Sequence, residues 1–202
     1  MKKTLSLALG IIMLACVLMT TVSAATTHTV ARGDTMWKIA VKYEVGLSEI
    51  KSANPQIANP DLIYPGQVLN IPTTNTSVLE YEKEVVRLVN EERTKNGLKP
   101  LTYDWELGRV ARIKSQDMRD NKYFSHTSPT YGSPFQMMKS FGIRYRSAGE
   151  NIARGQRTPK AVVDAWMNSS GHRANILNSS FTHIGVGYVS NGNYWTQMFV
   201  GR

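Results

Sequence analysis

The chain has 202 residues, 42% of them apolar, which is enough for one ordinary domain or two small ones and too much for a disordered chain. Its formal net charge of +9 is compatible with a polyanionic partner such as nucleic acid. A single cysteine, Cys16, excludes a disulfide within the chain and a thiolate zinc site. Packing alone must therefore hold the fold together.

Residues 1–24 have the pattern of a secretory signal peptide. Two lysines precede an apolar run of about 15 residues, and Val22-Ser23-Ala24 supplies the small residues that a signal peptidase recognises. A membrane-spanning helix needs about 20 apolar residues, so we expect export and cleavage after Ala24 in preference to an uncleaved anchor. A lipoprotein acylated at Cys16 is a further alternative, for which residues 13–15 are a poor recognition triplet. We expect a secreted, extracytoplasmic mature chain with no transmembrane segment and no thiol.

The positive charge is confined to the C-terminal part of the chain. Removal of residues 1–24 takes away two lysines and no acids, so the net charge falls from +9 to +7. Residues 28–72 hold four basic and four acidic side chains, and the whole excess therefore follows residue 77. Residues 73–77, Thr-Thr-Asn-Thr-Ser, have no apolar residue and no periodicity, which indicates a linker. The sequence thus predicts one domain over 27–72 and a second over 78–202.

The first domain has the predicted order strand, helix, helix, strand. Residues 28–31 alternate, and a turn at Gly33-Asp34 leads into a helix capped by Asp34 or Thr35. Its apolar positions recur at helical spacing: Trp37, Ile39, Ala40 and Tyr43. A second helix is predicted from Ser48, as its cap, to Ala53, before Asn54-Pro55. Residues 68–71 form the closing strand.

These residues resemble a LysM module over its whole length. Three motifs in order carry the resemblance: His28-Thr29-Val30 through Gly33-Asp34-Thr35-Met36-Trp37-Lys38-Ile39-Ala40, Asn54-Pro55, and Ile-Tyr-Pro-Gly-Gln-Val-Leu-Asn-Ile-Pro at 63–72. The resemblance implies a small βααβ fold that binds N-acetylglucosamine glycans, here peptidoglycan, in a shallow groove between two loops. Exposed loops can offer the acetamido groups backbone donors and acceptors. The glycan-binding residues that it implies are Gly33, Asp34, Thr35, Met36, Asp61, Leu62 and Ile63.

Two of the residues in these motifs have a second interpretation. Trp37 invites a sugar-stacking role, but its place in the helical stripe favours the core. Asp34 is equally a helix cap, with a glycan contact as the alternative.

The second domain begins with predicted helices and ends with a hairpin. The helices are Leu79–Asn96, ended by Gly97; one capped by Asp104 and continuing to about Asn121; one from Ser133-Pro134 to Phe141; and one from Thr158-Pro159 through Met167. Residues 182–189 alternate, Asn191-Gly192 has the chemistry of a positive-φ turn, and residues 194–200 return.

Three ionisable residues lie in short motifs of this domain: His126 in Phe-Ser-His-Thr-Ser, Glu150 in Gly-Glu-Asn-Ile, and His172 in Ser-Gly-His-Arg. Taken singly, each histidine is more simply a hydrogen-bonded surface or core residue. Together with Ala-Trp-Met-Asn-Ser-Ser-Gly-His-Arg-Ala-Asn-Ile-Leu (165–177) and Ile-Gly-Val-Gly-Tyr (184–188), they resemble the bacterial branch of the CAP superfamily of cysteine-rich secretory and pathogenesis-related proteins.

The resemblance implies an α-β-α sandwich whose cleft carries two histidines and two acids, and in some members a divalent metal. His126 and His172 match the histidines and Glu150 one acid, which makes these three the candidate catalytic residues. Ser169 stands where relatives place the second acid, so chemistry that needs an acid pair is in doubt. Two imidazoles and one carboxylate could hold Zn²⁺ with an open water position, His126 and His172 being the metal ligands. A hydrogen-bonded cluster without metal is the alternative.

A serine nucleophile is not favoured. Ser125 adjoins His126, and Ser169-Ser170 approach His172, but neighbours in sequence do not face each other in the way that nucleophile and base must, and no Gly-x-Ser-x-Gly motif is present.

A basic cluster surrounds Glu150 in the sequence, and it is either a solvated face or a surface for anionic wall polymers. Its members are Lys139, Arg144, Arg146, Arg154, Arg157 and Lys160.

The overall expectation is an α+β protein in which a LysM module binds peptidoglycan and a CAP domain presents a His/Glu/His cleft in the wall. The role is then one of binding or structure in the envelope or spore, with wall polymers and not nucleic acid as partners. Metal-assisted hydrolysis of wall material or peptide is the alternative, so whether the protein is an enzyme stays open.

Overall fold

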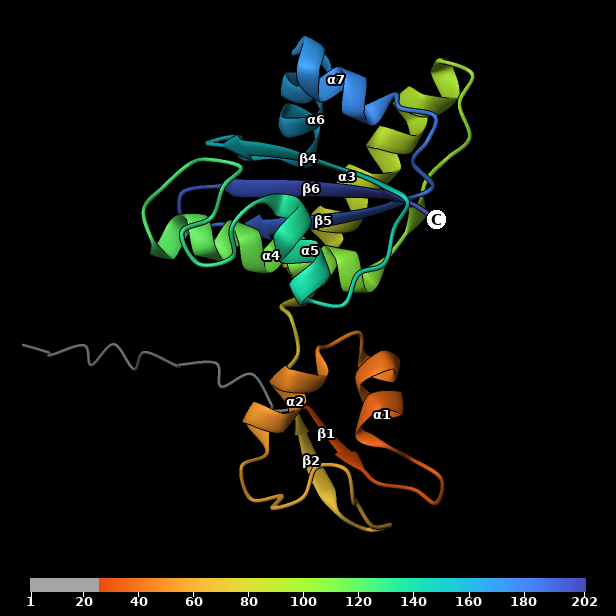
Figure 1. Ribbon diagram of the computed structural model, residues 1–202, viewed down its shortest axis with the longest axis vertical. Coiled ribbons are helices and arrows are strands. Elements are labelled where there is room, and N and C mark those ends of the chain that lie inside the picture. Colours follow the sequence, from red (N-terminus) through yellow and green to blue (C-terminus); the bar gives the residue numbers. More distant parts are fainter. Residues whose placement is uncertain (1–25) are drawn as a thin grey trace, which may run out of the picture.

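A computed structural model describes residues 26–202, which form two modules (Figure 1). The predicted signal peptide lies outside the described residues. The N-terminal module contains β1 (Thr26–Thr29), α1 (Met36–Tyr43), α2 (Leu47–Ala53) and β2 (Val68–Ile71). Its two strands pair antiparallel, with Thr26 opposite Ile71 and Thr29 opposite Val68. The predicted βααβ order is confirmed.

The two helices of this module have defined N-terminal caps. Of the two caps predicted for α1, Asp34 and Thr35, the structure has Thr35, whose hydroxyl accepts the Lys38 N–H at 3.1 Å. The second helix starts one residue before Ser48, and the Glu49 carboxylate turns back to accept the N–H of Gly46, the capping residue, at 2.8 Å.

Trp37 was predicted to be core, and this is wrong. Its side chain is 51% exposed, because Met36, one position earlier, fills the core beneath α1. The buried apolar residues of the module are Val30, Met36, Ile39, Ala40, Val45, Ile50, Leu69 and Ile71.

The C-terminal domain contains a four-stranded sheet and five helices. Its elements in chain order are α3 (Thr76–Lys95), β3 (Thr102–Tyr103), α4 (Trp105–Asp120), α5 (Pro134–Ser140), β4 (Ser147–Arg154), α6 (Pro159–Met167), α7 (Ser170–Ile176), β5 (His183–Val189) and β6 (Tyr194–Gly201). The strand order is β3-β5-β6-β4, with β6 antiparallel to both of its neighbours and β3 parallel to β5. Strand β4, at the edge, carries Glu150.

Helices cover both faces of this sheet. Figure 1 shows α4 and α5 on one face and α3, α6 and α7 on the other. Successive residues of β6 point to opposite faces of the sheet. Phe199 packs in the same core as Trp166 of α6. Met198 packs on the other face with Leu107 of α4 and Met137 of α5. The predicted α-β-α sandwich, and with it the α+β class, is confirmed.

Helix α4 lies against the backbone of β5. A methyl group at Gly187 would lie 2.0 Å from the Arg112 nitrogen, and one at Gly185 would lie 2.2 Å from the Gly108 nitrogen. Only glycine allows this close approach. The close packing of α4 on β5 thus explains the two glycines of the Ile-Gly-Val-Gly-Tyr motif.

Several boundaries differ from the sequence expectation. Helix α3 starts at Thr76, inside the expected linker, since the Asn75 side chain accepts the Ser77 N–H at 2.9 Å and caps the helix. In the last hairpin the positive-φ residues are Gly192 and Asn193, not Asn191. Strand β4 and helix α7 were not predicted as elements.

Within residues 26–202, no helix has the length and apolarity required to cross a bilayer.

Candidate functional site

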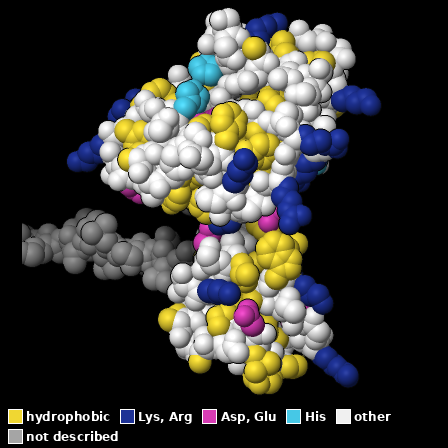
Figure 2. Space-filling model, viewed as in Figure 1, with side chains coloured by type: hydrophobic (Ala, Val, Ile, Leu, Met, Phe, Trp, Pro, Cys, Tyr) yellow, Lys and Arg dark blue, Asp and Glu magenta, His cyan; other side chains and the backbone are white. Residues whose placement is uncertain are grey.

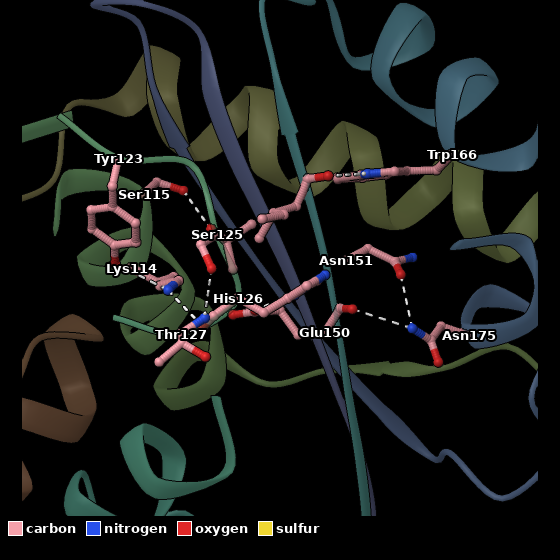
Figure 3. Close-up of polar contacts among 12 residues, drawn as sticks. Lys114, Ser115, Tyr123, Ser125, His126, Thr127, Glu150, Asn151, Trp166 and Asn175 are labelled. Atoms are coloured by element: carbon pink, nitrogen blue, oxygen red, sulfur yellow. Dashed lines mark hydrogen bonds and ion pairs between the residues drawn. The ribbon is translucent and has the colours of Figure 1, made fainter. Parts of the chain in front are cut away.

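A histidine and a buried glutamate form the centre of the candidate site. Glu150 projects from β4, and His126 lies in the connection between α4 and α5, with its Nδ1 2.7 Å from Glu150 Oε1 (Figure 3). The Glu150 side chain is 1% exposed and that of His126 is 53% exposed. The carboxylate therefore holds an imidazole that faces solvent, in the way that an orienting acid holds a general base.

Lys114, which was not predicted from the sequence, supports the segment that carries His126. Its side chain is fully buried in α4, and Nζ donates to the His126 carbonyl at 2.9 Å and to the Tyr123 hydroxyl at 3.0 Å. Figure 3 shows Lys114 and Tyr123 on the opposite side of His126 from Asn175. The signal was present, because Lys114 lies at helical spacing between the buried Ala111 and Met118.

Asp117, one turn further along α4, fixes the loop that carries His126. Its carboxylate accepts hydrogen bonds from the Tyr123 hydroxyl, from Ser128 Oγ at 2.7 Å, from Thr130 Oγ1 at 2.9 Å and from Asn121 Nδ2 at 2.7 Å. Burial alone would raise the pKa of Asp117, but these hydrogen bonds outweigh it and hold the pKa below its ordinary value. The loop is thus tied to α4 at both ends.

Helix α7 brings His172 to the other side of β4. Asn175 of this helix donates to the Glu150 carbonyl at 3.2 Å and to Asn151 Oδ1 at 2.9 Å, and Asn151 Nδ2 donates to the His172 carbonyl at 3.1 Å. A methyl group at Gly149 would lie 2.9 Å from the Phe181 ring, so this strand needs glycine to pack here. The Gly-Glu-Asn motif therefore joins the two histidine segments.

The three predicted residues influence each other electrostatically. Burial raises the pKa of Glu150, and the hydrogen bond from His126 and the charge of Lys114 offset this only in part. Burial lowers the pKa of His172, with a smaller contribution from the neighbouring His126. The second carboxylate oxygen of Glu150, Oε2, is buried without a hydrogen-bond partner among the described residues. Histidine side chains gather at this surface of the domain (Figure 2).

The residues present do not form a metal centre with three protein ligands. Among residues 26–202, no three His, Cys, Asp or Glu side chains are close enough together to hold an ion. The Glu150 carboxylate is bound to His126, which leaves two imidazoles where a catalytic zinc usually has three protein ligands. Metal binding by His126 and His172 therefore stays a prediction.

Among the described residues, none of the serines beside the histidines forms a hydrogen bond with an imidazole ring. Ser125 Oγ accepts the Thr127 N–H at 3.2 Å, and Ser169 precedes the first turn of α7. Of the basic residues that surround Glu150 in the sequence, Lys160 pairs with Asp164 at 2.6 Å and Arg154 stacks on the Tyr194 ring at 4.7 Å. The cation that acts on Glu150 is Lys114 instead.

The N-terminal module brings its two predicted loops to one end. The Gly66 N–H donates to the Val30 carbonyl at 2.9 Å, which joins the end of β1 to the segment that enters β2. Figure 1 places this end of the module away from the C-terminal domain. Exposed side chains on the second loop are Asp61, Leu62 (52%) and Tyr64 (55%).

Asp34 has a structural role in the first loop. Its Oδ2 accepts the Ala31 N–H at 2.9 Å and lies 2.9 Å from His28 Nε2, while His28 Nδ1 lies 3.1 Å from the Tyr43 hydroxyl. The hydrogen bond with His28 lowers the pKa of Asp34. The carboxylate thus clamps the β1–α1 loop, in which Gly33 has a φ of 88°.

The other predicted glycan-binding residues differ in what they can offer a ligand. Thr35 is exposed, although its hydroxyl caps α1. Met36 is 3% exposed, so its side chain belongs to the core and only its backbone is available. Ile63 packs partly against the same core.

Family models match both modules. The LysM domain model covers residues 28–72, and that of the cysteine-rich secretory protein family, CAP, covers residues 86–201, more than half of the chain. The chain belongs to the CAP family. Its CAP domain carries the His126–Glu150 pair, and its LysM domain carries the two exposed loops.

Three relatives illustrate this similarity. The chain is 67% identical to YkwD of Bacillus subtilis (strain 168) over 127 residues, 63% of this chain and 49% of that protein. It is 36% identical to the membrane protein YlbC of the same strain over 176 residues, 80% of this chain and 49% of YlbC. A crystal structure of an extracellular SCP-domain protein from Bacillus anthracis str. Ames matches with a TM-score of 0.60 and 34% identity, over 68% of this chain and 47% of that one. The chain spans about half the length of these relatives.

Proposed function

We propose that this protein is an extracellular, cell-wall-associated binding protein that attaches through its LysM domain to N-acetylglucosamine glycans of peptidoglycan. The observation that supports this most is the exposed end of the LysM domain. There the β1–α1 loop is held in place by Asp34, and the second loop presents Leu62 and Tyr64 to solvent. A loop surface with backbone polar groups and a few apolar side chains suits acetamido sugars.

The CAP domain supplies the second half of the proposal. The His126–Glu150 pair, with His172 beside it, takes a small ligand in the wall or spore envelope, and a structural role in envelope assembly follows. The positive charge of this domain favours wall polymers that carry phosphate, in a manner that depends on salt. The extracellular relative from Bacillus anthracis supports this location.

A second candidate function is hydrolysis of wall material or peptide. The 2.7 Å contact between His126 and Glu150 favours it, because a carboxylate that orients an imidazole is the arrangement of a general base. Such a base would activate water, with His172 as the other polar group at the site.

Co-sedimentation with purified peptidoglycan tests the first function. The mature chain should be retained, and soluble N-acetylglucosamine oligomers should release it. Leu62→Asp should weaken retention, whereas Val41→Asp, an equally drastic change at an exposed position of α1, should not. Equal retention of wild type and Leu62→Asp, or none for either, would contradict the proposal.

Lytic assays and metal analysis decide between binding and hydrolysis. The mature protein, His126→Ala and His172→Ala are compared for release of soluble wall fragments and for bound metal. Release that both substitutions abolish would establish the hydrolase. Retention on the wall without release by wild type supports the binding function.

A further inference from the structure

Two arginines on one face of α4 reach towards the LysM domain. Arg109 and Arg112 are three residues apart, so their side chains leave the helix on the same side. Both are largely buried, with side chains 14% and 13% exposed. Figure 1 shows α4 on the side of the CAP domain that faces the N-terminal module.

Arg109 makes the direct contact between the domains. Its Nη1 donates to Glu49 Oε1 of α2 at 3.0 Å, and its guanidinium lies 5.2 Å from the centre of the Phe141 ring. A methyl group at Gly46 would lie 2.5 Å from the same nitrogen, so the LysM backbone approaches Arg109 closely. The other oxygen of Glu49 accepts the Gly46 N–H and caps α2. This second contact holds the carboxylate in position for Arg109.

Arg112 binds the segment that connects the two domains, residues 73–75. It forms two hydrogen bonds with the fully buried Glu82, at 2.9 and 2.5 Å, and Glu82 also accepts the Tyr188 N–H at 2.9 Å. The remaining Arg112 nitrogen donates to Thr74 Oγ1 at 3.1 Å. Since Glu82 balances its charge, Arg112 acts on the connecting segment as a fixed donor. The segment predicted from the sequence to be a linker is therefore bound to the CAP domain through Thr74.

We propose that the LysM domain docks on α4 of its own CAP domain through Arg109 and Glu49, with Arg112 and Thr74 as the anchor, so that both domains tumble as one body. The glycan-binding end then always points away from the CAP domain, and the His126 site keeps a fixed position relative to the wall. None of the hydrophobic clusters of the described residues includes side chains from both domains. A hollow of about 270 Å³, whose lining includes Glu49, Arg109 and Arg112, lies beside the ion pair. Loss of one ion pair should therefore release the LysM domain.

Backbone ¹⁵N relaxation of the mature full-length chain tests this without any ligand. Wild type should give one rotational correlation time for amides of both domains. Arg109→Ala should give a shorter time for LysM amides than for CAP amides, with the chemical shifts of each domain's core unchanged. Glu49→Gln, whose amide oxygen can still cap α2, should have the same effect.

Arg87→Ala is the matched control, because Arg87 is an ion-paired arginine on the exposed face of α3, where it pairs with Glu84 and Glu91. It should keep the single correlation time. Separate correlation times in wild type, or a single time in both Arg109→Ala and Glu49→Gln, would overturn the proposal. These results are independent of whether the LysM domain binds glycan.

Discussion

Replacement of Glu150 by glutamine should stabilise the CAP domain at neutral pH. The Glu150 side chain is 1% exposed, and within residues 26–202 only one of its carboxyl oxygens has a hydrogen-bond partner, the His126 ring. A buried polar atom without a partner costs about 1–3 kcal/mol, and more when it is charged. The amide keeps the shape and can still accept from His126, and its buried NH2 group, although it has no partner either, is neutral and costs less to bury than a charged oxygen. Exchange of a charge-assisted hydrogen bond for a neutral one costs about 1 kcal/mol. We expect a net gain of about 1 kcal/mol in the free energy of unfolding.

The free energies of unfolding of wild type and Glu150→Gln should depend differently on pH. Burial raises the pKa of Glu150 above that of the unfolded chain, so the folded protein takes up this proton first as the pH falls. Wild type therefore gains stability from this group as the pH falls through the folded pKa towards 4.5. The glutamine variant has no such group, and its advantage should shrink over the same interval.

Urea unfolding at pH 7 and pH 5 measures this difference. Trp166 and Trp195 are fully buried in the CAP domain, so their fluorescence reports its unfolding. Glu80→Gln, at an exposed position of α3, is the control and should stay within about 0.5 kcal/mol of wild type. A less stable Glu150→Gln variant at pH 7, or an advantage that does not change with pH, would refute the reasoning.

Three further substitutions test other parts of the structure. Asp34→Asn should weaken binding of N-acetylglucosamine oligomers several-fold, as measured by calorimetry, and equal affinities would contradict the role of Asp34 in holding the β1–α1 loop. Because the hydrogen bond with His28 lowers the pKa of Asp34, wild-type binding should fall only as the pH drops below the ordinary carboxyl range. Gly187→Ala should cost more than about 3 kcal/mol in urea unfolding, because its methyl group meets the α4 backbone, whereas Gly171→Ala, with open space around it, should be neutral or slightly stabilising. Arg93→Met should cost about 2–4 kcal/mol, because the buried guanidinium donates to the carbonyls of Lys99, Ile176 and Asn178; a cost below about 1 kcal/mol would argue against this role.

The elements predicted best from the sequence were those with local signals. Asp104 caps α4 as predicted, and Ser133-Pro134 and Thr158-Pro159 begin helices as predicted, because these signals depend on residues within one turn. The hairpin of β5 and β6 was predicted from the alternation of Ile184, Val186 and Tyr188 with two glycines and from the turn residues Asn191-Gly192. In contrast, β4 was missed, since all but one of residues 149–153 are uncharged and all five are buried, so no alternation marks the strand.

Of the candidate site, the two histidines and the glutamate were predicted from the sequence. His126, Glu150 and His172 are far apart in the sequence, and a resemblance, not periodicity, brought them together. Lys114 was missed because a buried lysine occupies a position that the helical pattern assigns to an apolar side chain. Trp37 was placed wrongly for the reverse reason: an apolar residue at helical spacing proved to be exposed, and Met36 took its place in the core.

The most direct test of the central claim is NMR titration of residues 25–202, the chain without the predicted signal peptide, with soluble N-acetylglucosamine oligomers. Anchoring through the LysM domain predicts saturable chemical-shift changes confined to residues 31–36 and 59–66, with the amides around His126 and Glu150 unaffected. The absence of shifts in these loops at saturating oligomer, or shifts confined to the CAP domain, would contradict the account.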